Sequence, residues 1–141
     1  MGASGIEQHL VERLCAEGSD VVSAYLFGSE AEGRTHGESD VDLGVLLPRD
    51  RFPDPPLRFE HRLSLCSRLA AGLGGRSLDL VVLNDTPPLL ARHIVTHGRR
   101  LMCTNPELDH AFVRDAQLRA ADIEPFVRRM RQISLERLAG S

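Results

Sequence analysis

Apolar and polar residues alternate along this chain with two different periods, and the period changes several times. Residues 6–17 carry apolar side chains three or four positions apart, as one buried face of a helix requires. Within residues 41–47, every second position from Val41 to Leu47 is apolar, which is typical of a half-buried strand. Reading the rest in the same way, with glycine and proline as stop signals, we expect helices at 6–17, 29–34, 57–73, 87–97 (capped by Asp85 or Thr86) and 106–138, strands at 21–27, 41–47, 77–83 and 99–103, and a loop at 48–56.

These elements predict the fold class α/β (α+β), with a small mixed sheet of about four strands covered by helices. We expect one domain over residues 1–141, with a core at about 6–103 and a C-terminal helical arm at about 106–138. Pro125 lies inside that arm and predicts a kink or a break near 123–124. An apolar stripe around Phe126, Met130 and Ile133 can pack on the protein's own sheet, which we favour, or bind a partner.

Composition narrows the possible functions. The net charge of −3 and the 4% aromatic content give no support to a DNA-binding surface or a base-stacking platform. No apolar run approaches 18 residues and no secretory leader is visible, so we expect a cytoplasmic protein without a membrane span. Two basic clusters stand out. Arg99 and Arg100 could touch a base or a phosphate, whereas Arg128, Arg129 and Arg131 are expected on a solvated helix face.

The stretch FGSEAEGRTHGESDVDL, residues 27–43, carries the candidate chemistry. Side chains two apart on a strand share a face, so Asp40 and Asp42 project together. Two adjacent carboxylates raise each other's pKa unless a cation lies between them. Mg²⁺ is the natural choice, because it takes hard oxygen ligands and keeps positions open for phosphate. The sequence therefore predicts a magnesium site at the start of this strand.

Two further features suit the same chemistry. Asp79 interrupts the apolar strand 77–83 and is a candidate third carboxylate, although it could equally face solvent at a strand edge. Gly28 and Ser29 follow a strand, where a glycine lets backbone amides approach a phosphate and a serine adds a hydroxyl. The combined pattern is G-S-x10-D-x-D followed by an acidic strand.

This pattern resembles the signature of the polymerase-β-type nucleotidyltransferase superfamily. The short length and the stretch LDLVVLNDTPPLLARHIVTHGRRL resemble its minimal members, the antitoxins encoded beside HEPN-domain ribonuclease toxins. The resemblance implies that Asp40, Asp42 and Asp79 hold two Mg²⁺ ions and that Asp79 helps to deprotonate the attacking hydroxyl. It further implies that Gly28 and Ser29 hold the triphosphate of ATP, and that AMP passes to a tyrosine of the partner toxin.

The segment after Gly-Ser departs from the family pattern, in which a basic residue often follows. Glu30 and Glu32 stand there instead, and Arg34 is the candidate substitute cation near the phosphates. Two alternatives therefore stay open beside catalysis: an antitoxin that neutralises its partner by contact alone, and nucleotidyl transfer to a small molecule. A hetero-oligomer with the toxin or a homodimer is compatible with each of them.

Overall fold

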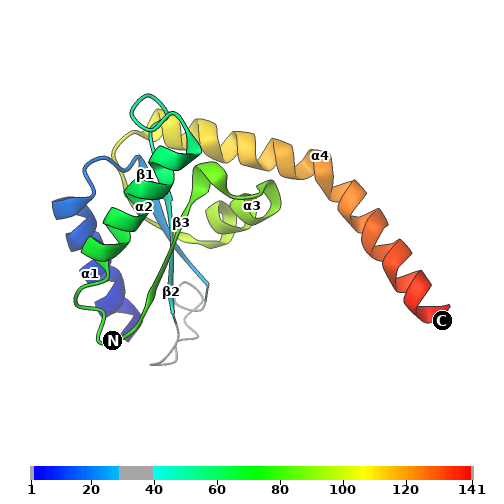
Figure 1. Cartoon of the computed structure of the whole chain (residues 1–141), viewed down its shortest axis with the longest axis horizontal. Coiled ribbons are helices and arrows are strands. Elements are labelled where there is room, and N and C mark those ends of the chain that lie inside the picture. Colours follow the sequence, from blue (N-terminus) through cyan, green and yellow to red (C-terminus); the bar gives the residue numbers. More distant parts are fainter. Residues whose placement is uncertain (1, 29–39, 141) are drawn as a thin grey trace.

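The computed structural model of the chain describes residues 2–28 and 40–140 (Figure 1). Four strands form one sheet in the order β3-β2-β1-β4. β1 (Ser23–Phe27) lies antiparallel to both β2 (Val41–Leu46) and β4 (Arg99–Cys103), whereas β2 and β3 (Leu78–Val82) are parallel. This mixed four-stranded sheet confirms the predicted fold class. The predicted short helix at 29–34 lies outside the described residues.

Helices cover both faces of the sheet. α1 (Gly2–Glu17) and α2 (Pro55–Leu69) pack on one face, with Leu14, Leu65 and Leu69 in its apolar layer. A short 3-10 helix, η1 (Leu83–Asp85), leads into α3 (Pro88–His97), which packs on the other face. α4 (Pro106–Ala139) runs alongside α3 and contacts it (Figure 1). Within the described part of the chain, no helix is both long and apolar enough to cross a membrane.

The sheet is buried more completely than the sequence pattern predicts. β2 was expected to be half-buried, yet five of its six residues are buried and only Asp42 is partly exposed. Gly44 and Leu46 on the second face are covered by η1 and α3, where Leu83 and Ile94 pack. Alternate side chains of β2 therefore point to two faces that are both packed. Only the end of the strand that carries Asp42 is partly exposed.

Several predicted helix ends are corrected by proline and glycine geometry. α2 begins inside the predicted loop 48–56, because Asp54 accepts the Leu57 amide as N-cap and prolines are tolerated in a first turn. It ends at Leu69 and not at 73, before Gly72 adopts a φ of +85°. In α3 neither predicted cap acts: Asp85 binds Arg58, and the Thr86 hydroxyl donates to the Val82 carbonyl.

The C-terminal arm differs from the packing that the sequence favoured. α4 stays one helix from Pro106 to Ala139, and it changes direction in its orange part, where Pro125 lies (Figure 1). The predicted kink is therefore present without a break. Beyond it the helix leaves the core, and Phe126 and Met130 are 60% and 46% exposed. The apolar stripe of the arm does not pack on the protein's own sheet.

A buried polar network ties α4 to the sheet. The Tyr25 hydroxyl donates to Asp109 Oδ1 at 2.7 Å, and Arg100 Nη1 donates to Asp109 Oδ2 at 2.9 Å. Tyr25 and Asp109 are buried, and burial together with the neighbouring Asp109 carboxylate raises the pKa of the tyrosine. Arg100 is thus committed to a structural ion pair, while Arg99 pairs with Glu7. Both arginines have protein partners in place of the base or phosphate that the sequence suggested.

Replacing Tyr25 with phenylalanine is expected to lower the free energy of unfolding by about 1–3 kcal/mol, because the buried Asp109 carboxylate loses one of its two donors. Urea denaturation followed by circular dichroism measures the change. Tyr25 also packs with Val22 and Ile94, and phenylalanine keeps that apolar contact. A stability equal to that of the wild type would show that the hydroxyl contributes nothing to holding α4.

Candidate active site

The predicted acidic residues meet at one end of the sheet. The parallel register pairs Asp42 of β2 directly with Asp79 of β3, and the antiparallel register pairs Asp42 with Phe27 of β1. Asp40 stands just before β2 and is exposed. Gly44 and Val81, each two residues further along its strand, face α3. Side chains two apart on a strand share a face, so Asp42 and Asp79 lie on the same side. The carboxylates therefore lie on the α3 face of the sheet.

The Asp42 carboxyl lies between Gly28 and Asp79. Gly28 follows β1 with a φ of +74°, and a Cβ atom built there would fall far inside van der Waals contact with Asp42 Oδ2. On the other side, Asp79 is paired with Asp42 in the parallel register, and its carboxylate raises the pKa of Asp42. A residue without a side chain is thus needed at position 28 for the carboxylate to occupy this place.

The pKa of Asp42 is raised above the usual aspartate value. The causes are burial first, then the negative charges of Asp79 and Asp40, and finally hydrogen bonding with Asp79, which requires a proton on one of the two carboxyls. An ionised Asp42 therefore raises the free energy of the folded protein while no cation is nearby. A carboxyl whose pKa is raised by burial and neighbouring charges is typical of functional sites, where a bound ligand can compensate the charge.

The donor set fits a hard divalent cation. Its groups are carboxylate oxygens, and a cation between Asp42 and Asp79 would remove the repulsion that raises the Asp42 pKa. In the described residues no three acidic, histidine or cysteine side chains are yet drawn together closely enough to hold a metal jointly. Asp40 acts on Asp42 through its charge, and Ser29 and Arg34 of the predicted phosphate cradle lie outside the described residues.

The raised pKa predicts how stability depends on pH. A carboxyl whose pKa is higher in the folded state stabilises the fold fully below the unfolded value of about 3.9, and this contribution is lost as pH rises through the folded pKa. Asparagine does not ionise, so the Asp42→Asn variant does not lose this stability as pH rises. In a chelating buffer, we expect the variant to melt above the wild type at pH 7 and at the same temperature near pH 3. Thermal melts of both proteins across this range measure the difference.

An exposed aspartate provides the control for that titration. Asp50 is exposed in the turn after β2, away from the acidic cluster. Asp50→Asn is expected to follow the wild-type curve at every pH. A constant offset between wild type and Asp42→Asn, independent of pH, would contradict the assignment of the raised pKa to Asp42.

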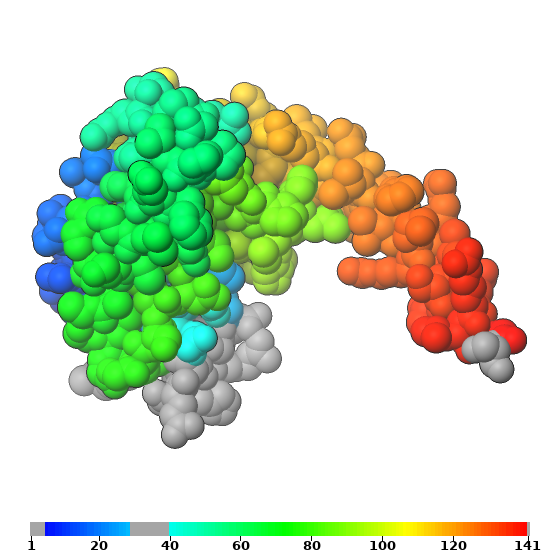
Figure 2. Space-filling view, in the orientation of Figure 1, coloured from blue at the N-terminus to red at the C-terminus, as the bar shows by residue number. Residues whose placement is uncertain are grey.

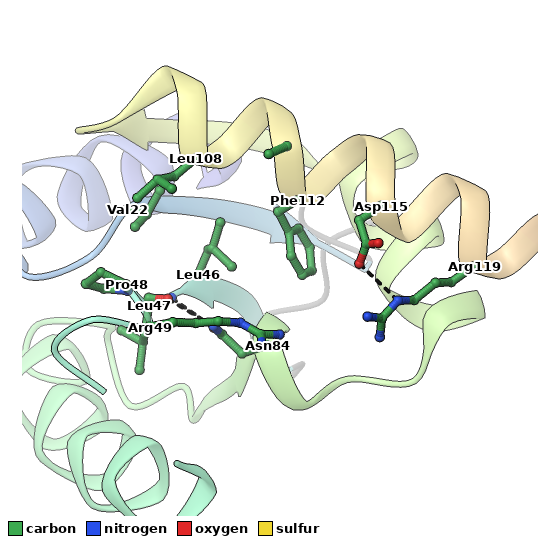
Figure 3. Close-up of a pocket in the computed structure, with 11 residues that line it drawn as sticks. Val22, Leu46, Leu47, Pro48, Arg49, Asn84, Leu108, Phe112, Asp115 and Arg119 are labelled. Atoms are coloured by element: carbon green, nitrogen blue, oxygen red, sulfur yellow. Dashed lines mark hydrogen bonds and ion pairs between the residues drawn. The ribbon is translucent and has the colours of Figure 1, made fainter. Parts of the chain in front are cut away.

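A separate hollow of about 310 Å³ lies at the opposite end of β2 (Figure 3). Leu46, Val22 and Phe112 give it an apolar wall, and the Asn84 side chain bonds both the amide and the carbonyl of Leu47 beside it. The Asp115–Arg119 ion pair stands at its edge, with 3.0 Å between nitrogen and oxygen (Figure 3). Since Asp42 lies near the start of β2 and Leu46 ends it, this hollow is distinct from the acidic site.

Fold and site together define a nucleotidyltransferase-type protein. Residues 10–107 match the family model described as polymerase beta, nucleotidyltransferase, and the chain belongs to that family. The match covers β1, β2 and β3 and therefore includes Gly28, Asp42 and Asp79. The resemblance seen in the sequence is confirmed.

Particular relatives are similar over much of this length. A protein adenylyltransferase MntA of Shewanella oneidensis is 35% identical over 83 residues, which are 59% of this chain and 55% of the relative. The chain thus matches about half the length of that curated relative. A crystal structure of a toxin–antitoxin with AMP-PNP is 26% identical with a TM-score of 0.65, covering 88% of this chain and 97% of that chain. A structure of an MntA–HpeT toxin–antitoxin variant is 27% identical with the same TM-score, covering 88% and 96%.

Proposed function

We propose that this protein is a cytoplasmic, magnesium-dependent nucleotidyltransferase that transfers AMP from ATP to a tyrosine hydroxyl of a HEPN-type toxin and so acts as its antitoxin. The observation that carries the proposal is the Asp42 carboxyl, held between Gly28 and Asp79 with a raised pKa. Support comes from the name of the Shewanella relative, a protein adenylyltransferase, and from the AMP-PNP in a similar toxin–antitoxin structure. We treat residues 1–141 as a single nucleotidyltransferase domain.

In the proposed reaction the acceptor hydroxyl oxygen attacks the α-phosphorus of ATP. A new P–O bond forms as the bond from the α-phosphorus to the bridging β-oxygen breaks, and pyrophosphate leaves with that electron pair. Asp79 is exposed at the site and takes the proton of the attacking hydroxyl. Asp40, Asp42 and Asp79 would hold the two Mg²⁺ ions, which would supply positive charge to neutralise the phosphates. Gly28, Ser29 and Arg34 form the proposed phosphate cradle.

Label transfer tests this function. The protein is incubated with α-labelled ATP, Mg²⁺ and the protein encoded by the neighbouring gene, and label is sought on a tyrosine of the latter. We expect Mg²⁺-dependent transfer that a chelator stops. Unlabelled partner in the presence of Mg²⁺ would overturn the proposal of AMP transfer to that protein.

Neutralisation by contact alone is the second candidate, and the exposed apolar arm is the observation that favours it. Phe126, Met130 and Leu135 line one hollow of the arm and are 60%, 46% and 65% exposed. A monomer seldom leaves such side chains together in water unless they bind something. This candidate predicts that a protein without the acidic site still suppresses toxicity of the neighbour when the two are co-expressed.

A further inference from the structure

Two hollows adjoin along the outer half of α4, one between α4 and α3 and the other lined by α4 alone. Their volumes are about 300 Å³ and 450 Å³, and they share Val127 and Arg131. Figure 2 shows the arm standing away from the core on this side, with open space beneath it. We name the pair the α3–α4 groove. The first hollow is lined by Leu89, Arg92, His93, Thr96, His97, Glu124, Val127, Arg128 and Arg131, and the second adds Phe126, Met130, Ser134 and Leu135.

One half of the groove is basic. Glu124 accepts from Arg92 Nη1 and from Arg128 Nη2, each at 2.8 Å, so a single carboxylate is shared by two guanidinium groups. Arg92 first, and then Arg128, lowers the pKa of Glu124, which keeps it ionised. Arg131 brings a third positive charge. The hollow thus carries two more positive than negative charges while His93 and His97 are neutral, in a protein whose net charge is −3.

The other half is apolar. Phe126 and Met130 are one helical turn apart and 60% and 46% exposed, and Leu135 continues the surface at 65%. Side chains at this spacing form one face of a helix, which is the geometry that receives an amphipathic partner helix. The groove therefore combines an apolar strip with a basic cluster beside it.

One wall of the groove, α3, lies on the same side of the sheet as the acidic site. α3 lies on the sheet face that carries Asp42 and Asp79. Its C-terminal end reaches the end of β1, because Gly98 lies against the Leu26 carbonyl and the next residue of β1, Phe27, is paired with Asp42. A segment lying in the groove would thus run from the arm toward the carboxylates. An acceptor bound there would therefore lie on the side of the sheet where its hydroxyl must react.

We propose that the α3–α4 groove docks an acidic amphipathic helix of the acceptor protein, with its carboxylates on Arg92, Arg128 and Arg131 and its apolar face on Phe126 and Met130. This proposal rests on the proposed function, since it names the surface that presents the acceptor. A second copy of this chain fits poorly. Pairing two arms would bring the groove arginines of both copies together, with only one Glu124 in each copy to neutralise them. Nucleic acid fits poorly because the apolar half of the groove offers its phosphates nothing.

Charge reversal tests the docking surface directly. Arg128→Glu combined with Arg131→Glu is compared with Arg129→Glu combined with Arg137→Glu, which makes the same charge change on the same helix outside the groove lining. Binding of the neighbouring gene's protein is measured by calorimetry without nucleotide, after circular dichroism has shown unchanged helix content. We expect the groove pair to weaken binding about a hundredfold, and the control pair less than threefold.

A second variant keeps the test independent of charge. Phe126→Ser combined with Met130→Ser changes exposed side chains only, and we expect it to weaken binding at least tenfold. Wild-type affinity in both groove variants, or absence of binding by the wild type, would overturn the docking proposal. So would tight binding of a labelled single-stranded RNA that is lost with the groove arginines while binding of the protein partner is unchanged.

The outcomes separate the two proposals. Loss of partner binding in the groove variants, with no AMP transfer by the wild type, supports docking and overturns the catalytic function. AMP transfer by the wild type, with undiminished binding by the groove variants, supports the function and overturns the groove as its docking surface.

Discussion

Replacing Asp40 and Asp42 together with asparagine is expected to lower the rate of AMP transfer about a thousandfold or more. Bound metal in phosphoryl and nucleotidyl transfer lowers the transition-state free energy by several kcal/mol, and each 1.4 kcal/mol corresponds to about a tenfold change in rate. Asp42 contacts Asp79 and is influenced by the charge of Asp40, so the double change removes most of the negative charge of the cluster. Quantifying labelled partner over time measures the loss.

A readout besides activity separates loss of metal binding from loss of fold. Mg²⁺ is expected to raise the melting temperature of the wild type and to leave that of the double variant unchanged, because a ligand stabilises only the state that binds it. In a chelating buffer the double variant is expected to be at least as stable as the wild type, since the repulsion that raises the Asp42 pKa is gone.

The matched control replaces two exposed aspartates far from the cluster. Asp50 lies in the turn after β2 and Asp122 on α4, and both are exposed. Asp50→Asn combined with Asp122→Asn changes the net charge equally and is expected to retain both transfer and the Mg²⁺-dependent shift. Unimpaired transfer by the Asp40 and Asp42 variant would remove these carboxylates from the mechanism.

Replacing Gly28 with alanine is expected to produce the second largest effect. The substitution places a Cβ on Asp42 Oδ2 and holds a non-glycine residue at a φ of +74°. The backbone conformation alone costs on the order of 1–3 kcal/mol of stability. Displacement of the carboxylate by about 1 Å is enough to lower the rate about a hundredfold. Transfer assays and thermal melts on the same preparation measure both effects.

Gly74 separates the steric effect from the backbone effect. It has a φ of +63°, and a Cβ built there has no atom within 4 Å. Gly74→Ala should therefore lose similar stability while keeping the wild-type rate of transfer. If both alanine variants transfer AMP equally well, the contact between position 28 and Asp42 has no part in catalysis.

Elements that depend on local pattern were predictable from the sequence. The strand 99–103 was predicted with its observed bounds, and the end of α3 at His97 followed from Gly98. The start of α4 at Pro106 was predicted as observed, whereas α1 and α2 begin earlier than predicted. At α2 the reason is that a proline signals a loop and a first helical turn equally. The Asp54 side chain decides between them at α2, by accepting the Leu57 amide.

The candidate site was predicted in part. Asp40 and Asp42 follow from a two-residue spacing on one strand, which is local information. The pairing of Asp79 with Asp42 depends on β2 and β3 being neighbours in parallel register, and the sequence could only suggest it. No sequence signal indicated the Arg92–Glu124 ion pair, whose residues are 32 positions apart. Arg128 and Arg131 are exposed, as predicted, and both also line the α3–α4 groove.

The sequence by itself determined the order of the strands and helices along the chain. It also indicated that two aspartates share one face of a strand and that a glycine follows the strand before them, because these features depend on spacing along one segment. The tertiary structure decided which carboxylates meet, which arginines serve as structural ion pairs, and that the outer half of α4 stands free. Those outcomes depend on contacts between segments far apart in the chain. Burial and neighbouring charge, and not residue type alone, then set the pKa of Asp42 and the exposure of Phe126.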